Sequence, residues 1–124
     1  MELKDKEKLV RVIGNADIAL QKLEYNINSY QAGGKTPPKS DVQLYKSIER
    51  ALAHLKQKPF IGDNIQKDHI PKELQHLPNL FRLELSQFWR LLYYVTGDEV
   101  RIILVVFEIC DHATYDRLFG YQKK

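Results

Sequence analysis

The strongest constraint on the fold is a hydrophobic period of two residues in the second half of the chain. Apolar and polar side chains alternate from Phe81 to Ser86, which is typical of a half-buried strand. An aromatic-rich segment at 89–95 and an apolar segment at 100–107 follow after connections of a few residues. Short connections favour antiparallel neighbours, so the sequence predicts a three-stranded meander. The third segment is apolar on both faces, and we expect it at the centre of the sheet.

Two helices are predicted before the meander. Residues 16–31 carry apolar side chains at three- and four-residue steps, and Asn15 precedes them as a candidate N-cap. Residues 41–57 carry a cleaner apolar stripe, and residues 40–43 have the spacing of a capping box. The glycines and prolines at 33–38 form a short connector, which favours an antiparallel hairpin of the two helices.

Three further segments complete the pattern. Leu9 to Ile13 favours a short strand, with a helical stripe as the competing interpretation. Residues 60–78 are polar and irregular, and a loop of that length in a small domain is often functional. Residues 111–121 indicate a short helix or turn that ends at Gly120. The order is strand, helix, helix, loop, three strands and tail. The helices are segregated from the meander, so the predicted class is α+β.

The composition is that of a globular domain. The chain has 124 residues, of which 44% are hydrophobic, so we expect one domain over residues 1–124. The longest apolar run, Ile102–Phe107, is far shorter than the roughly 20 residues that span a bilayer. Residues 1–8 lack the apolar centre of a signal peptide, and a lone Cys110 allows no internal disulfide. These features predict a cytoplasmic protein without a membrane partner.

The charge pattern excludes a broad nucleic-acid-binding field. The formal net charge is only +3, and no segment forms a basic tail. RNA binding would therefore depend on a few placed cations. The chain has no phosphate-binding glycine loop, paired-cysteine motif or nucleophile elbow, and its four histidines are scattered. We therefore expect neither a metal nor a cofactor.

Polar groups on the meander and tail are the candidates for chemistry. Arg82 and Glu84 share one face of the first meander strand, for which a solvated sheet face is the competing interpretation. Arg90 lies among apolar neighbours and must find a partner or line a cleft, in a structural or a functional role. His112 and Tyr115 are three residues apart and would share a helical face, for which simple packing is the alternative.

These segments resemble a known family. The runs 79–95, 100–107 and 111–121 are similar to the C-terminal half of RelE-type toxins. These toxins cut messenger RNA in toxin–antitoxin pairs, and ParE and HigB are their relatives. The family pattern is a basic strand, a strand with an arginine between aromatic and apolar residues, a hairpin, an apolar strand, and a terminal His or Arg with Tyr. The resemblance extends loosely over 9–121 and is specific over 79–121.

The resemblance implies two helices packed on a small, mostly antiparallel curved sheet with the site on its concave face. Arg90 matches the family's arginine on the second meander strand, and Arg82 matches a cation on the strand before it. His112 and Tyr115 match the terminal acid/base and stacking positions. Glu84 departs from the most basic family members, which often carry a second cation there, but a carboxylate is a sensible general base.

The implied activity is metal-independent cleavage of messenger RNA on the ribosome, which inhibits translation. The 2′-hydroxyl would attack its own adjacent phosphate, the two arginines would stabilise the developing charge, and Glu84 and His112 would exchange protons with the substrate. Tyr115 would stack on a base or donate a proton. Further RNA-binding candidates are Lys67, Lys72 and Arg117. The implied partner is a cognate antitoxin, in a toxin–antitoxin hetero-oligomer.

Two alternatives stay open. A ParE-like protein of the same fold would bind DNA gyrase without cutting RNA, and Arg90 would then be architectural. A degenerate toxin fold would serve only as an interaction module, because a fold does not determine a function. The pairing of His112 with Tyr115 favours the nuclease.

Overall fold

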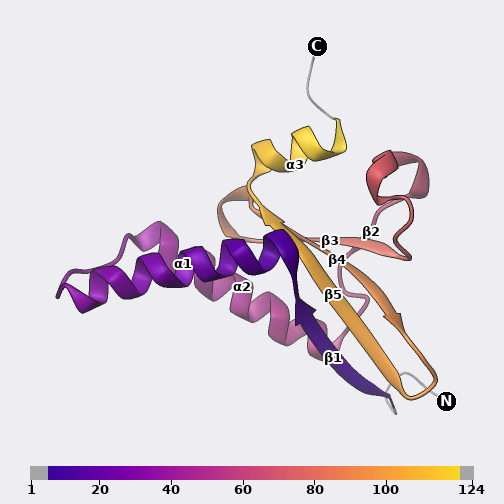
Figure 1. The fold of residues 1–124 in the computed structure, drawn as a ribbon, viewed down its shortest axis with the longest axis horizontal. Helices are drawn as coiled ribbons and strands as arrows, with labels where there is room; N and C mark the ends of the chain where they lie inside the picture. Colours follow the sequence, from indigo (N-terminus) through magenta and orange to yellow (C-terminus); the bar gives the residue numbers. More distant parts are fainter. Residues whose placement is uncertain (1–5, 121–124) are drawn as a thin grey trace.

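A computed structural model describes residues 6–120 as an α+β fold (Figure 1). Its strands are β1 (Glu7–Val12), β2 (Asp63–Asn64), β3 (Leu80–Glu84), β4 (Arg90–Gly97) and β5 (Arg101–Cys110). Its helices are α1 (Gly14–Ala32), α2 (Lys39–Gln57) and α3 (His112–Phe119), and its single 3-10 turns are η2 (Lys67–His69), η3 (Lys72–Leu74) and η4 (Ser86–Phe88). None of the helices within residues 6–120 is long and apolar enough to cross a membrane.

The sheet is mixed and open, with strand order β1-β5-β4-β3-β2 in the described part of the chain. The predicted meander is confirmed, since β3, β4 and β5 pair antiparallel in sequence order. The strand interpretation of residues 9–13 is also confirmed. β1 pairs parallel with β5, so that Glu7 lies opposite Arg101 and β5 has a neighbour on each side, as its apolar sequence predicted.

The predicted loop at 60–78 contains structure that the sequence pattern did not reveal. Asp63 and Asn64 form β2, an edge strand that pairs antiparallel with Arg82 and Phe81 of β3. A two-residue strand is too short to show a period of two, so pattern reasoning could not find it. The turns η2 and η3 follow, and Ile70 between them is buried.

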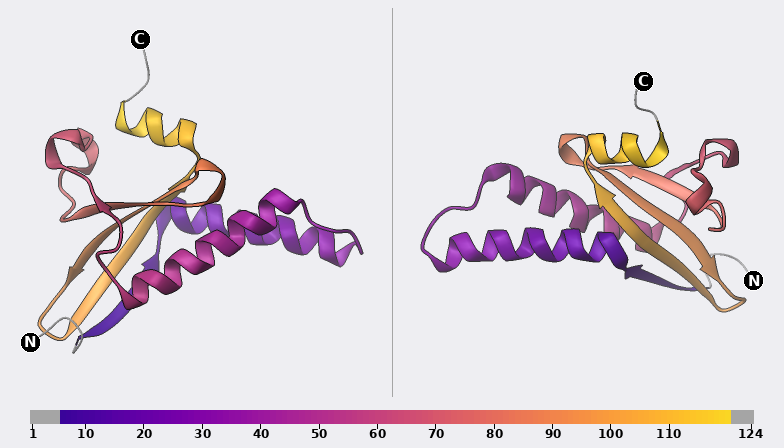
Figure 2. Two further views of the ribbon diagram at one scale, coloured as in Figure 1. Left: turned by 180° about the vertical axis from the view of Figure 1, so that it is seen from behind. Right: turned by 45° about the horizontal axis from the view of Figure 1, so that its top comes forward.

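The helical hairpin covers one face of the sheet and extends beyond its edge (Figures 1 and 2). The core under it contains leucines and isoleucine of α2 together with alternate residues of β3, β4 and β5. Leu55, Leu91 and Leu104 in this core have no exposed surface. The apolar stripe of residues 41–57 therefore faces the sheet, as the sequence predicted.

The opposite face of the sheet is covered by α3 and the turns of the 65–77 segment (Figure 2). A smaller core fills this side, with Ile70, Leu80, Leu92, Cys110, Tyr115 and Phe119 as its buried members. The Asp111 carboxylate caps α3 by accepting a hydrogen bond from the Thr114 amide. Gly120 ends α3 in the left-handed region, at φ 71°, as predicted for this glycine.

Both predicted helix caps are wrong. α1 begins after Ile13, and the Asn15 side chain donates to Glu108 Oε1 at 3.1 Å instead of capping the helix. α2 begins at Lys39 after Pro38, one residue before the predicted capping serine. Ser40 is therefore already inside the first turn, where its side chain cannot act as the N-cap.

Candidate functional site

Two arginines meet one tyrosine on the α3 face of the sheet. Arg82 comes from β3, Arg90 from β4 and Tyr115 from α3. Arg82 Nη1 donates to the Tyr115 hydroxyl at 2.9 Å. The guanidinium carbons of both arginines lie 5.6 Å from the centroid of the Tyr115 ring. We call these three residues, together with Glu84, the arginine–tyrosine cluster.

Strand geometry explains why the cluster forms. Arg82 and Glu84 are two residues apart on β3, so their side chains leave the same face of the sheet. Glu84 lies opposite Arg90 in the register of β3 and β4. Residues next to them in sequence, such as Leu83 and Leu91, belong to the core under the helical hairpin. The alternation that predicted a half-buried strand therefore places the charged residues on one side.

Ion pairs of the cluster are long and partly exposed. Arg90 Nη2 lies 3.7 Å from Glu84 Oε1, and Arg82 Nη2 lies 3.7 Å from Asp63 Oδ2. Burial acts to lower the pKa of Arg82, but the Tyr115 hydroxyl and the charges of Asp63 and Glu84 raise it overall. Arg82 therefore stays protonated at any physiological pH.

Some hydrogen-bond donors of the cluster have no acceptor among the described residues. The side chain of Arg90 is only 12% exposed, whereas that of its partner Glu84 is 67% exposed. The Nε atoms of Arg82 and Arg90 are buried and have no hydrogen-bond partner among the described residues. A buried N–H without an acceptor is costly, and guanidinium N–H groups are strong donors to anionic oxygens, so an anion that comes close to the two arginines would be bound favourably.

Tyr115 is not placed to stack on a base. Its residue surface is 3% exposed, and its ring stacks on Phe119 at a centroid distance of 4.5 Å. The arginines of the cluster lie over the same ring. In this conformation the geometry supports a positioning role, in which the Tyr115 hydroxyl holds the Arg82 guanidinium.

His112 lies outside the cluster contacts. Its Nε2 atom is 3.2 Å from Asp116 Oδ2, one turn along α3, and its side chain is 57% exposed. His112 and Tyr115 were predicted to share a face of the helix. The structure instead buries Tyr115 in the core and exposes His112 to solvent. The orientation of α3 on the sheet decides this, and a three-residue spacing does not predict it.

The remaining RNA-binding candidates are surface cations. Lys67 on η2 and Lys72 on η3 are exposed. Both turns belong to the segment that covers the same face of the sheet as α3. Arg117 is exposed on α3, where its Nη2 donates to Thr114 Oγ1 at 3.1 Å.

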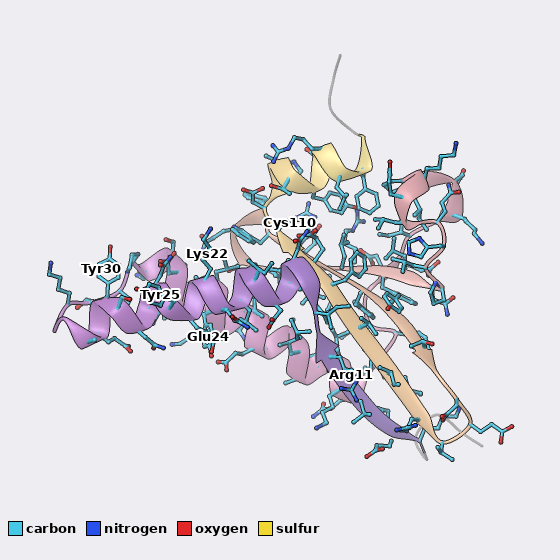
Figure 3. All side chains as sticks on the ribbon, in the orientation of Figure 1. Arg11, Lys22, Glu24, Tyr25, Tyr30 and Cys110 are labelled. Atoms are coloured by element: carbon cyan, nitrogen blue, oxygen red, sulfur yellow. The ribbon has the colours of Figure 1, made fainter. Side chains whose placement is uncertain are left out.

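A separate groove of about 470 Å³ lies between α1, α2 and the carboxyl end of β5, and no residue of the cluster lines it. Figure 3 labels two of its lining residues, Lys22 and Cys110. Burial and the charges of Glu108 and Asp111 raise the pKa of the Cys110 thiol to about 12. Cys110 is therefore protonated near neutral pH and is no nucleophile.

No metal site accompanies these groups. Among residues 6–120, no three or more His, Cys, Asp or Glu side chains are grouped so that they could hold a metal ion.

Phe88 is an exposed aromatic residue to which the sequence analysis gave no functional role. It lies in η4, the short connection between β3 and β4, and its surface is 74% exposed. Its carbonyl accepts a hydrogen bond from Arg90 Nη1 at 3.1 Å. The sequence did contain a signal for Phe88. It is an aromatic residue in a strand connection, two positions before the candidate Arg90.

No protein-family model, curated protein or solved structure matches this chain.

Proposed function

We propose that this protein is a RelE-like toxin, a metal-independent endoribonuclease that cuts messenger RNA on the ribosome. It would act in the cytoplasm and inhibit translation until a cognate antitoxin binds it. The observation that carries the proposal is the arginine–tyrosine cluster. Two mostly buried guanidiniums, whose Nε atoms have no partner within residues 6–120, lie beside an exposed carboxylate on the sheet face opposite the helical hairpin.

The cluster has groups for two of the three tasks in RNA cleavage. Arg82 and Arg90 present donors to the scissile phosphate, and they stabilise the negative charge that builds up on its oxygens. Glu84 is exposed, lies 3.7 Å from Arg90 and takes the proton of the 2′-hydroxyl. The 2′-oxygen then attacks phosphorus and the bond to the 5′-oxygen breaks, which leaves a 2′,3′-cyclic phosphate.

The third task, protonation of the 5′-oxygen, falls to His112 in this proposal. His112 is exposed, and its Nε2 atom lies 3.2 Å from Asp116 Oδ2. Its position at the start of α3, the helix that also carries Tyr115, supports the assignment. Lys67 and Lys72 supply further positive charge along the RNA from the same side of the sheet.

Arg90 is the residue that tests the proposal. Expression of the wild-type protein without a partner should arrest translation and produce cut messages. Arg90→Ala should lower the rate of message cleavage by about 10²- to 10³-fold. Arg90→Lys should restore little, because an ammonium lacks the planar fork of donors. The measurements are the cleavage rate of a reporter message in a translating extract and the melting temperature of the same purified variants.

Arg101→Ala is the matched control. Arg101 also pairs with a carboxylate at 3.7 Å, that of Asp98, but at the far end of β5. This variant should cut messages at the wild-type rate. A stable and fully active Arg90→Ala protein would refute the site. Growth arrest with continuing protein synthesis and altered DNA supercoiling would instead indicate a gyrase inhibitor, and normal growth with well-expressed protein would indicate an interaction module.

A further inference from the structure

The turn between β3 and β4 holds its backbone in an unfavourable conformation. Gln87 and Phe88 have φ values of 60° and 64°, and they are the described non-glycine residues with positive φ. The left-handed region is uncommon for such side chains and clusters at functional sites. Two consecutive residues of this kind therefore indicate that the surrounding structure imposes the conformation.

Helix α2 and the ends of the two strands fix this turn. Gln87 Nε2 donates to the Ser40 carbonyl at 2.8 Å, and the Ser86 amide donates to Ser47 Oγ at 2.9 Å. The Leu85 amide also donates to the Trp89 carbonyl at 2.8 Å, which closes the turn. The result is a rigid support that presents Phe88 outward, with 74% of its surface exposed.

The backbone of Phe88 is hydrogen-bonded to an arginine of the proposed phosphate site. Arg90 Nη1 donates to the Phe88 carbonyl at 3.1 Å, so the guanidinium and the aromatic residue belong to one hydrogen-bonded unit. The Arg90 Nε atom has no partner among the described residues. In a nucleotide the phosphate and the base are also close neighbours, and single-stranded RNA is bound by cations on its phosphates and aromatic rings on its bases.

We propose that Phe88 is a stacking platform for a nucleobase of the RNA whose phosphate lies on Arg82 and Arg90. The proposal rests on the proposed function, and it moves base stacking from the buried Tyr115 to the exposed Phe88. A protein partner fits the turn less well. Ser86 and Gln87, which precede Phe88, are polar, whereas a protein-docking site of this kind needs a contiguous apolar patch.

The test uses ribosomes programmed with a short synthetic message. Single-turnover cleavage is measured for the wild-type protein and for Phe88→Ala, Phe88→Leu and Phe88→Trp. Loss of one base stack corresponds to a decrease of about 5- to 150-fold. We expect that decrease for the alanine and leucine variants, and near wild-type rates for tryptophan. Ile18→Ala is the control, since Ile18 on α1 is also an exposed apolar residue, at 62%.

A second arm removes the base. Messages that lack one base at a time near the cut should slow the wild-type protein at one position and leave Phe88→Ala unchanged there. A Phe88→Ala protein that cuts at the wild-type rate overturns the inference and leaves the proposed function standing. Full activity of Phe88→Leu overturns it too, in favour of an apolar protein contact. If the wild-type protein cuts no message, the proposed function fails and the inference fails with it.

Discussion

The two faces of the sheet are built by the same strands and differ in what they bury. Toward the helical hairpin, β4 presents Leu91 and Tyr93, which have no exposed surface. Toward α3, the same strand presents Arg90, whose Nε atom is buried without a described partner. Neighbouring residues of β4 therefore differ in role, since Leu91 fills the core and Arg90 carries a charge to the other face. We infer that the hairpin face supplies most of the stability, and that the α3 face carries charge that the fold alone does not require.

Leu91 and Arg90 give the sharpest test of this comparison, because they are adjacent and point to opposite faces. Leu91→Ala should lower the free energy of unfolding by about 2–5 kcal/mol, since it leaves a cavity in the main core. Arg90→Ala should lower it far less. Urea unfolding with an unchanged slope measures both. Equal losses for the two variants would show that Arg90 is a structural residue.

Two tyrosines provide a second comparison. The Tyr93 hydroxyl donates to the Pro59 carbonyl at 2.9 Å and accepts from the Gly62 amide at 3.0 Å. Tyr93→Phe leaves the buried Pro59 carbonyl and the partly buried Gly62 amide without this partner, and it should cost about 1–3 kcal/mol of unfolding free energy. Tyr115→Phe removes an acceptor of the partly exposed Arg82, and we expect it to cost less stability and to slow message cleavage. Thermal unfolding measures the stability of the two variants, and the cleavage assay measures their activity. A larger loss of stability for Tyr115→Phe than for Tyr93→Phe would contradict the division between the two faces.

The smallest expected effect is at Glu108, at the edge of the groove. Burial raises the pKa of Glu108, although the Asn15 hydrogen bond opposes this. Because its pKa is raised in the folded state, Glu108 favours folding when it is protonated. The contribution of this group to stability is complete below the unfolded pKa and is lost as the pH rises through the folded pKa. Ionised Glu108 therefore weakens the fold at neutral pH.

Glu108→Gln should accordingly be slightly more stable than the wild type at pH 7, by less than about 1 kcal/mol because the group is partly solvated. The difference should shrink toward pH 4, where the wild-type carboxyl gains its proton. Melting temperatures at both pH values measure this. A variant that is less stable than the wild type at pH 7 would show that the carboxylate has a favourable partner there.

Periodicity predicted the parts of the fold that have a period. The meander and the helical hairpin follow from repeats of two or about 3.6 residues over many positions. The interior position of β5, between β1 and β4, follows from its apolar residues on both faces. β2 has two residues and no period, and the helix caps depend on one residue each. Ser40 and Asn15 are both good capping residues, but the helices begin at neighbouring positions. The Asn15 side chain bonds Glu108 instead, and Ser40 contributes its backbone carbonyl to a bond from Gln87.

The sequence predicted the positions of the candidate site residues that lie on strands, but not of those outside them. Arg82, Glu84 and Arg90 come together because strand alternation and short connections determine their common face. His112 was expected with them, but its direction depends on how α3 docks, which no local pattern encodes. Phe88 escaped prediction because its left-handed backbone lacks the usual glycine or asparagine signal.

The parallel pairing of β1 with β5 has a consequence for the order of folding. Glu7 meets Arg101 across the sheet, so the hairpin of helices and the rest of the meander all lie between them in sequence. Contacts between distant segments form late, because the long intervening chain must first be closed into a loop. During synthesis, β1 leaves the ribosome long before its partner strand exists. The edge of the sheet is therefore completed after the meander, and a chain interrupted before β5 leaves β1 unpaired.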